Sequence, residues 1–458
     1  MGWLPRRSQP EPATAHARAR AGRWTGARWA GLGLAGSGAV LGGLAGGFMV
    51  VGVTLVLKAG IELASAQGLW FALTVPPLGL LLAVLTLHGY GLVPGAPLEK
   101  KRARAWRTFP PDAARADISA DVVASAGQEE RSPWRLAPIR TVAILATVGL
   151  GGAMGTEAPA AYLGVATGAW LADRGPWWRR LLRPAALAGG AAGVAALMGI
   201  PLVGTAFMLE LGRRQRAALS AERVLAALVG GVIGWGIDTV FGLSLIRLVV
   251  PREAPGTLGQ AIITALFIGA ASGAISATAG AAVYQAKRWQ AAPAWRLALG
   301  VMATVAIALA LARIAVPSAA VGPGGGAILW AESVDARPFA ALAVCLLRAA
   351  ATTAAVAAGG CGGVFVPFLA VGDLAGRVFA PGLRVGHDLA GAAGAAGGIA
   401  GGYRLPFTAA AMVLGIGGPP RATLTCLATV LIASVVSTAA KTLLPLAMRI
   451  VRRSAATV

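Results

Sequence analysis

A lone glutamate, Glu157, lies inside an apolar stretch of the chain that reads GTEAP at this point. The nearest charged residues on either side are Arg140 and Asp173. Pro159 follows two positions later, and proline favours the first turn of a helix because its missing N–H would have no partner there. That turn carries unpaired N–H groups and the positive end of the helix dipole, which attract negative charge. The pattern therefore predicts a carboxylate near a helix N-terminus in apolar surroundings.

The composition indicates that these surroundings are a lipid bilayer. Of the 458 residues, 57% are hydrophobic and 13% are charged, and the mean hydropathy is +0.71. Soluble chains carry about 25% charged residues. Apolar runs of the ~20 residues needed to cross a bilayer recur along the chain, and Trp29–Leu57 is the first of them. We therefore predict an all-α, multi-pass integral membrane protein.

The net charge of +22 comes largely from basic residues clustered in short segments, such as Glu99–Arg107 and Trp177–Arg183. Loops rich in Lys and Arg stay on the cytoplasmic side of a membrane. Because such segments lie too close to lipid to serve nucleic acid, we expect no nucleic-acid partner. Residues 1–28, rich in Arg and Pro, are expected to form a disordered cytoplasmic tail, since the apolar run behind them is too long for a cleavable signal. We expect both termini on the cytoplasmic face of a bacterial plasma membrane.

Side chains suited to enzymatic chemistry are scattered along the chain. Cys345, Cys361 and Cys426 lie in apolar runs at spacings that suit neither a metal site nor a disulfide framework. The three histidines are far apart and follow no metal-ligand pattern. Because the apolar runs contain no nucleophile–base pair and no set of metal ligands, we expect neither an enzyme nor a bound cofactor or metal.

Two stretches, Gly155–Gly164 and Gly363–Gly372, share the pattern G-x3-P-x3-[LV]-G. Each is followed, at nearly the same spacing, by a second proline segment that begins at Pro201 or Pro406. The matching order predicts two homologous halves. The expected organisation is a tail at 1–28, a first half at 29–225, a second half at 226–453 and a tail at 454–458.

Gly and Pro that interrupt apolar segments at corresponding positions of two halves point to a transport site between the repeats. A break in a helix at mid-membrane must line a cavity or be buried in protein, because lipid offers no hydrogen bonds. Helices that start near Pro159 and Pro367 would present free N–H groups there, and several such N-termini make an anion site. The alternative, for either segment alone, is a kinked packing helix with Gly at close contacts.

With these residues in view, the chain resembles the CLC family of chloride channels and chloride/proton exchangers. GTEAP is similar to the family's G-[KR]-E-G-P motif, and GVFVP at Gly363–Pro367 matches its G-x-F-x-P motif. Tyr403–Gly418 is similar to the family's R-x-P-L-T segment. The resemblance runs from about Trp29 to Arg453. It implies a homodimer with one anion pathway per subunit, built from two inverted halves whose broken helices meet at a mid-membrane anion site. The chain ends soon after its last predicted helix, so we expect no cytoplasmic CBS pair.

The resemblance also implies a role for each motif residue. Glu157 would be the gate, a carboxylate that occupies an anion site itself and leaves when it is protonated or displaced. Backbone amides beside it would line an outer anion site, and the backbone of the second motif would hold a central anion. The residues implied are Thr156, Glu157, Ala158, Gly363, Val364 and Phe365.

One departure concerns proton coupling. The family's exchangers carry an inner glutamate ten residues after the proline that follows the gate segment, and here Pro201 leads to Leu211 at that place. Glu210 precedes it by one position. Because leucine cannot carry a proton, we expect passive conduction of chloride or a similar anion, gated by Glu157. The alternative is a chloride/proton exchanger that uses Glu210.

A second departure concerns the inner gate, which in the family pairs a serine with a tyrosine near the C-terminus. Here Ala116 takes the place of the serine, Ser119 lies close but offset, and no tyrosine follows near the C-terminus. Thr438 and Thr442 are the hydroxyl donors that could stand in. These losses leave a further alternative of another class, a membrane scaffold of CLC type that does not transport.

Overall fold

The computed structural model describes residues 14–89, 118–127, 132, 134–174, 182–214, 216–244, 248–289, 291–333 and 336–455. Within these residues the regular structure is helical, as predicted, and one isolated β-bridge joins Gly155 to Gly363. Seven of the described helices are long and apolar enough to cross a membrane. They are α1 (Thr14–Ala66, apolar from Gly36), α2 (Leu69–Gly89), α8 (Ala221–Phe241), α9 (Leu258–Arg288), α10 (Pro293–Ile314), α12 (Pro338–Ala358) and α17 (Pro420–Ala455).

The remaining elements are shorter, and several begin at a proline. They are α3 (Ile118–Gly127), η2 (Trp134–Leu136), α4 (Ala137–Ile144), the π-helix η3 (Leu145–Gly149), α5 (Glu157–Ala172), α6 (Leu182–Met198), α7 (Pro201–Arg214), η5 (Pro317–Ala320), α11 (Gly325–Ser333), α13 (Phe365–Arg377), α14 (Ala380–Leu383), α15 (His387–Gly398), the π-helix η6 (Ile399–Tyr403) and α16 (Pro406–Ile416). Short helices that end inside the protein are what a broken-helix membrane fold requires, since their termini must find partners away from lipid.

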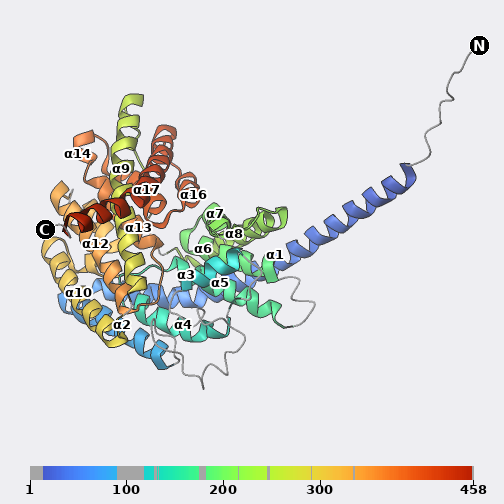
Figure 1. The fold of residues 1–458 in the computed structure, drawn as a ribbon, viewed down its shortest axis with the longest axis horizontal. Helices are drawn as coiled ribbons and strands as arrows, with labels where there is room; N and C mark the ends of the chain where they lie inside the picture. Colours follow the sequence, from blue (N-terminus) through green and yellow to red (C-terminus); the bar gives the residue numbers. More distant parts are fainter. Residues whose placement is uncertain are drawn as a thin grey trace, which may run out of the picture.

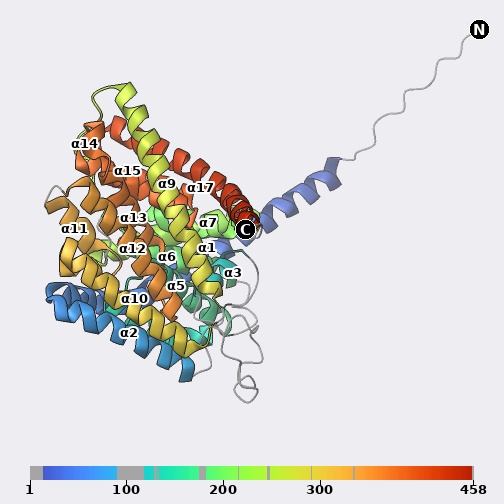
Figure 2. The same ribbon diagram turned by 60° about the vertical axis from the view of Figure 1, so that its left-hand side comes forward.

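The same packing pattern occurs twice. In the first half α5 packs on α6, α6 packs on α8, and α1 packs on α6 and α8. In the second half α13 packs on α15, α15 packs on α17, and α9 packs on α15 and α17. The two sets lie beside each other, the first in blue to green and the second in yellow to red (Figure 1). Helices α2 and α10 pack against each other along one edge of the molecule (Figure 2).

Glycines set how closely the helices around the two motifs approach. A Cβ added at Gly164 in α5 would overlap the carbonyl oxygen of Gly189 in α6. A Cβ added at Gly372 in α13 would likewise overlap the carbonyl oxygen of Gly394 in α15. The last glycine of each motif therefore lets the backbones touch, as small residues do between membrane helices.

Two boundaries differ from those expected. Helix α1 begins at Thr14, inside the segment 1–28 that we expected to be disordered, because its Ala- and Arg-rich sequence favours helix once the early prolines are passed. The expected border between the halves at 225/226 falls inside α8. The packing places α8 wholly with the first set, so the border that fits the structure is the connection between α8 and α9.

Candidate functional site

The N-termini of α5 and α13 meet where the two motifs pair with each other. The Gly155 N–H donates to the Gly363 carbonyl oxygen at 2.7 Å, and the Gly363 N–H donates to the Gly155 carbonyl oxygen at 2.8 Å. These glycines hold the first position of each motif, and the bridge between them is antiparallel. The two repeats therefore run in opposite directions where their equivalent glycines pair.

Glu157 is the first residue of α5, and its carboxylate reaches across to the other half. Oε1 accepts hydrogen bonds from the N–H groups of Phe365 at 2.8 Å and of Val366 at 3.2 Å. The residue is fully buried, with 0% of its surface exposed. A carboxylate in this position satisfies two of the N–H groups that the first turn of α13 leaves unpaired.

The two bridge glycines leave the space that the carboxylate fills. A Cβ at Gly155 would lie 2.5 Å from Oε2 of Glu157, and a Cβ at Gly363 would lie 2.5 Å from Oε1. Real Cβ atoms do not approach oxygen so closely, so any other residue at either position would push the carboxylate away. The backbone pairing and the carboxylate site are therefore one unit.

Two buried polar atoms at this unit have no hydrogen-bond partner among the residues that the structure describes. They are Oε2 of Glu157 and the hydroxyl oxygen of Thr156. Buried polar groups are nearly always paired, so each unpaired atom needs an explanation, such as a proton, an ion or a water. The carboxylate therefore has one oxygen, Oε2, available to a further hydrogen-bond donor.

An aromatic cluster lies against the residue that holds Glu157. The ring of Phe365 packs edge-on against Phe207 of α7, with centroids 6.0 Å apart, and against Tyr403 of η6 at 5.8 Å. Phe207 and Tyr403 stack on each other at 6.2 Å. Neither of these rings was among the site residues predicted from the sequence, and the amide of Val366 was not among them either. The amide could have been inferred as the next N–H in the first turn of α13.

Glu210 lies in α7 and binds the N-terminus of α16 in the other half. Its carboxylate accepts the N–H groups of Phe407 at 3.1 Å and Thr408 at 2.9 Å, and the Thr408 hydroxyl at 2.8 Å. The next residue, Leu211, has 1% of its surface exposed and packs in the apolar core. Glu210 thus acts as an N-cap supplied by a distant part of the chain.

The three hydroxyl donors considered from the sequence lie in different surroundings. Ser119 is half-buried in the first turn of α3, a helix that packs on α5 and α7. Thr438 is exposed on α17, and its hydroxyl donates to the carbonyl oxygen of Ser434 at 2.8 Å. Thr442 belongs to the same helix, but its side chain lies outside the described residues. The structure therefore does not bring Thr438 to Glu157.

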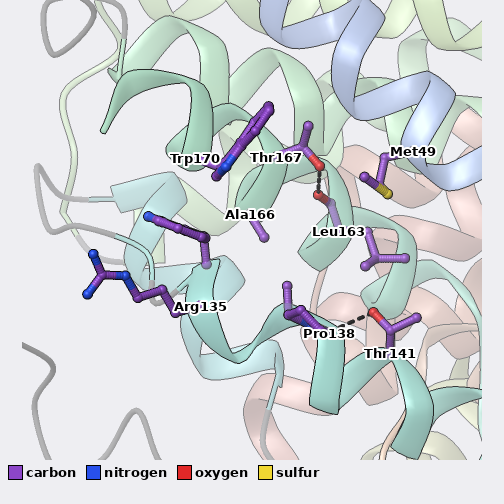
Figure 3. Close-up of a pocket in the computed structure, with 10 residues that line it drawn as sticks. Met49, Arg135, Pro138, Thr141, Leu163, Ala166, Thr167 and Trp170 are labelled. Carbon is purple, nitrogen blue, oxygen red and sulfur yellow. Dashed lines mark hydrogen bonds between the residues drawn. The ribbon is translucent and has the colours of Figure 1, made fainter. Parts of the chain in front are cut away.

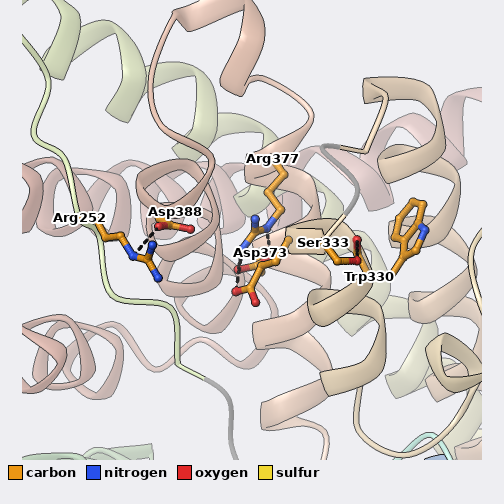
Figure 4. A network of polar contacts seen from close by, with 7 residues as sticks. Arg252, Trp330, Ser333, Asp373, Arg377 and Asp388 are labelled. Atoms are coloured by element: carbon orange, nitrogen blue, oxygen red, sulfur yellow. Dashed lines mark hydrogen bonds and ion pairs between the residues drawn. The ribbon is translucent and has the colours of Figure 1, made fainter.

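A second buried polar network lies farther along α13. Arg377 binds Asp373 at 2.6 Å and Glu332 at 3.4 Å, and both Arg377 and Asp373 are almost fully buried (Figure 4). Asp373 and Arg377 lie one turn apart in α13, so each neutralises the charge of the other within one helix. Among the described residues, no group of three His, Cys, Asp or Glu side chains gathers as a metal site would require.

A separate apolar cavity of about 600 Å³ lies between α1, α4 and the C-terminal part of α5 (Figure 3). Met49, Leu163 and Trp170 are among its lining residues. None of the described residues that line it belongs to the Glu157 site. The two features share only helix α5.

The model of a family described as voltage gated chloride channel matches residues 103–438. The chain belongs to this family. The resemblance found in the sequence is thereby confirmed, although the match is shorter than the expected Trp29 to Arg453. The chain is a multi-pass membrane protein of the CLC type, a family of anion transport proteins. No curated protein sequence matches the chain.

Solved structures share the fold at low sequence identity. A CLC-type fluoride/proton antiporter is 20% identical, with a TM-score of 0.68 over 88% of this chain and 95% of that one. A slow cyanobacterial Cl−/H+ antiporter is also 20% identical, with a TM-score of 0.62 over 89% of this chain and 94% of that one. A eukaryotic CLC transporter is 14% identical, with a TM-score of 0.60 over 89% of this chain and 72% of that one. The all-helical CLC fold is therefore confirmed.

Proposed function

We propose that this protein exchanges a small halide for protons, and that Glu157 is both its gate and its proton carrier. The observation that carries the proposal is the position of the Glu157 carboxylate on the Phe365 and Val366 amides. An anion and a carboxylate compete for the same N–H groups, since both are acceptors that suit a helix N-terminus. Two of the similar structures are of proton antiporters, which agrees with exchange.

The hydrogen bonds of the carboxylate suit proton uptake. Oε1 holds both amides, while Oε2 has no partner among the described residues and is free to take a proton. Protonation removes the negative charge that the α13 amides stabilise, so the carboxyl group leaves and an anion replaces it. When the anion moves on, the carboxyl group releases its proton and returns to the amides. Anion and proton then occupy the site in alternation.

Passive conduction, which we expected from Leu211, becomes the second candidate. The buried leucine offers no proton acceptor at the inner position, and this observation favours a channel. Glu210 is the nearest acid along α7, and in the described state its carboxylate is bound to the first turn of α16. Exchange therefore requires Glu210 to share a proton from this position, or water to reach Glu157 from inside.

Purified protein in liposomes distinguishes the two. A chloride gradient is applied with a pH-sensitive dye inside, and chloride and proton movement are followed together for wild type and Glu157→Gln. Exchange predicts uphill proton movement in wild type that is lost in the variant, while chloride flux continues. Chloride flux without proton movement in wild type would establish the channel, and no flux from folded protein would favour a scaffold that does not transport.

We further propose a homodimer with both termini on the cytoplasmic face. Exposed apolar side chains on α8 and α17, such as Val232, Trp235, Leu431 and Val435, need either lipid or a second copy to cover them. Crosslinking of single-cysteine variants on these faces tests the dimer. Labelling of cysteines in the basic loops from either side of the membrane tests the orientation.

A further inference from the structure

The cavity between α1, α4 and α5 has walls that suit an apolar occupant. Leu163 and Ala166 of α5 line it and are buried. The hydroxyl of Thr141 donates to the carbonyl oxygen of Ala137 at 2.7 Å. The hydroxyl of Thr167 donates to the carbonyl oxygen of Leu163 at 2.8 Å, so both lining threonines bond within their own helices (Figure 3). An ordered water needs about two to four polar partners, whereas apolar cavities stay dry or take apolar molecules.

One end of this cavity is formed by two tryptophans, each with an arginine on its ring. The guanidinium of Arg135 lies over the ring of Trp134, 5.3 Å from its centroid. The guanidinium of Arg174 lies over the ring of Trp170 at 3.8 Å. Both tryptophans line the cavity, both arginines are exposed, and the indole N–H of Trp134 donates to Asp173 at 3.3 Å. Two cations and one acid give these side chains a net positive charge.

The cavity extends from the level of the lipid headgroups into the hydrocarbon. Trp170 lies thirteen residues after Glu157 on α5, which is about 20 Å along the helix. With Glu157 at the expected mid-membrane site, Trp170 reaches past the ~15 Å half-thickness of the hydrocarbon, the level that tryptophan prefers. Met49 also lines the cavity, lies in the middle of the apolar stretch Gly36–Ala66 of α1 and is half exposed. The cavity therefore has an apolar part beside the lipid chains and a basic end at the headgroups.

We propose that this cavity binds one anionic phospholipid, whose acyl chain fills the apolar part and whose phosphate lies at Arg135 and Arg174. Basic pockets between membrane helices attract anionic headgroups, and the planar set of N–H donors of a guanidinium suits phosphate oxygens. A zwitterionic headgroup adds an ammonium group that the arginines repel, so the site favours a lipid with net negative charge. The site goes beyond transport at Glu157, since it lies at the other end of α5.

The test measures lipid binding to the purified protein after its lipids have been removed in detergent. The probes are dioleoyl phosphatidylglycerol and dioleoyl phosphatidylcholine, which share their acyl chains and differ in net charge. Native mass spectrometry counts the lipids bound per subunit at increasing lipid concentration. We expect one tightly bound phosphatidylglycerol per subunit, with an affinity about tenfold above that of phosphatidylcholine, because two arginines lie at the phosphate.

Two variants separate the two parts of the site. Arg135→Gln combined with Arg174→Gln removes the charge at exposed positions, so the two lipids are expected to bind equally. Ala166→Phe fills the apolar part and is expected to remove the binding of both. Arg213→Gln is the matched control, because Arg213 is an exposed arginine over another ring, that of Phe407 at 5.4 Å, outside the cavity. This control is expected to keep the wild-type preference.

Three results overturn the proposal. One is equal binding of the two lipids by wild type, and another is a preference that survives in the double arginine variant. The third is a wild type that binds neither lipid tightly while Ala166→Phe dissociates its oligomer, which would mean that a second copy covers the cavity. If Ala166→Phe does not fold, the double arginine variant still decides, since both of its changes are at exposed side chains. Loss of anion flux in liposomes bears only on the proposed function, because lipid binding is measured without transport.

Discussion

Glu157 and Phe365 hold the third position of the two repeated motifs, yet one is the acceptor and the other the donor of the same hydrogen bond. Glu157 contributes a carboxylate from the first half, and Phe365 contributes the amide that binds it from the second. Both motifs begin with a glycine, and these two glycines, Gly155 and Gly363, pair with each other. The comparison shows that the backbone of the site is symmetric while its chemistry is divided, so neither half could form the site alone.

The two helices continue to differ behind their motifs. Val165 and Ala169 of α5 are apolar and buried. The positions that correspond to them in α13 are Asp373 and Arg377, which form the buried ion pair. Where the first half has these two apolar residues behind its motif, the second half thus has an acid and a base that neutralise each other.

The largest effect is expected when the ion pair that distinguishes α13 from α5 is removed. Asp373→Ala leaves Arg377 buried without its main partner, and loss of one partner of a buried pair costs about 3–5 kcal/mol of folding stability. The corresponding change in the first half, Val165→Ala, removes only apolar volume and is expected to cost less than half as much. Denaturant or thermal unfolding in detergent compares the two. Equal losses would show that the ion pair does not stabilise α13.

The next largest effect is expected at the two glycines whose backbones pair across the site. Gly363→Ala and Gly155→Ala each place a Cβ within 2.5 Å of the Glu157 carboxylate, so both are expected to displace it and reduce proton-coupled flux at least about tenfold. Gly52→Ala is the control, because a Cβ there meets nothing within 4 Å. A variant that retains wild-type coupling at either bridge glycine would contradict the described position of the carboxylate.

A third prediction concerns the Glu157 carboxylate alone and leaves the α13 amides unchanged. Protonation releases Glu157, so wild-type halide flux is expected to rise as the pH falls. Glu157→Gln has no charge to gain or lose, and its flux is expected to vary less than about twofold over the same pH range. Flux measured in liposomes buffered equally on both sides checks this. A pH dependence that survives in the variant would assign proton sensing to another group.

A smaller effect concerns the other carboxylate that crosses between the halves. Glu210→Gln keeps the shape of the cap on α16 but removes its charge, and we expect a loss of about 1 kcal/mol in stability. Thr408→Val, which removes one of its donors, serves as the paired variant. If anion flux continues with proton movement lost in Glu210→Gln, this residue also relays protons. Unchanged coupling would leave it as a structural cap.

The smallest effect is expected at Thr438. Its hydroxyl bonds within its own helix on an exposed face, so Thr438→Val is expected to change stability by less than about 0.5 kcal/mol and to leave the flux ratios of anions unchanged. A clear change in selectivity would mean that α17 turns this face toward the pathway in another state.

Local patterns in the sequence were enough to predict the membrane class, the two related halves and a helix start near Pro159. They were enough because lipid forces apolar runs into helices and because proline and glycine mark the breaks. The packing of Phe207 and Tyr403 on Phe365 could not be predicted in this way. These contacts join residues far apart in the chain, and their geometry depends on how the two halves dock.

The backbone contacts at Gly164 and Gly372 have a consequence for how the protein responds to warming. A joint made of two backbones has no side-chain rotamers to redistribute, so it gains little conformational entropy as the temperature rises. The spacing between α5 and α6, and between α13 and α15, is therefore expected to stay nearly constant until the protein unfolds. The activation energy of transport would then report the departure of the Glu157 side chain rather than a loosening of the helices that hold it.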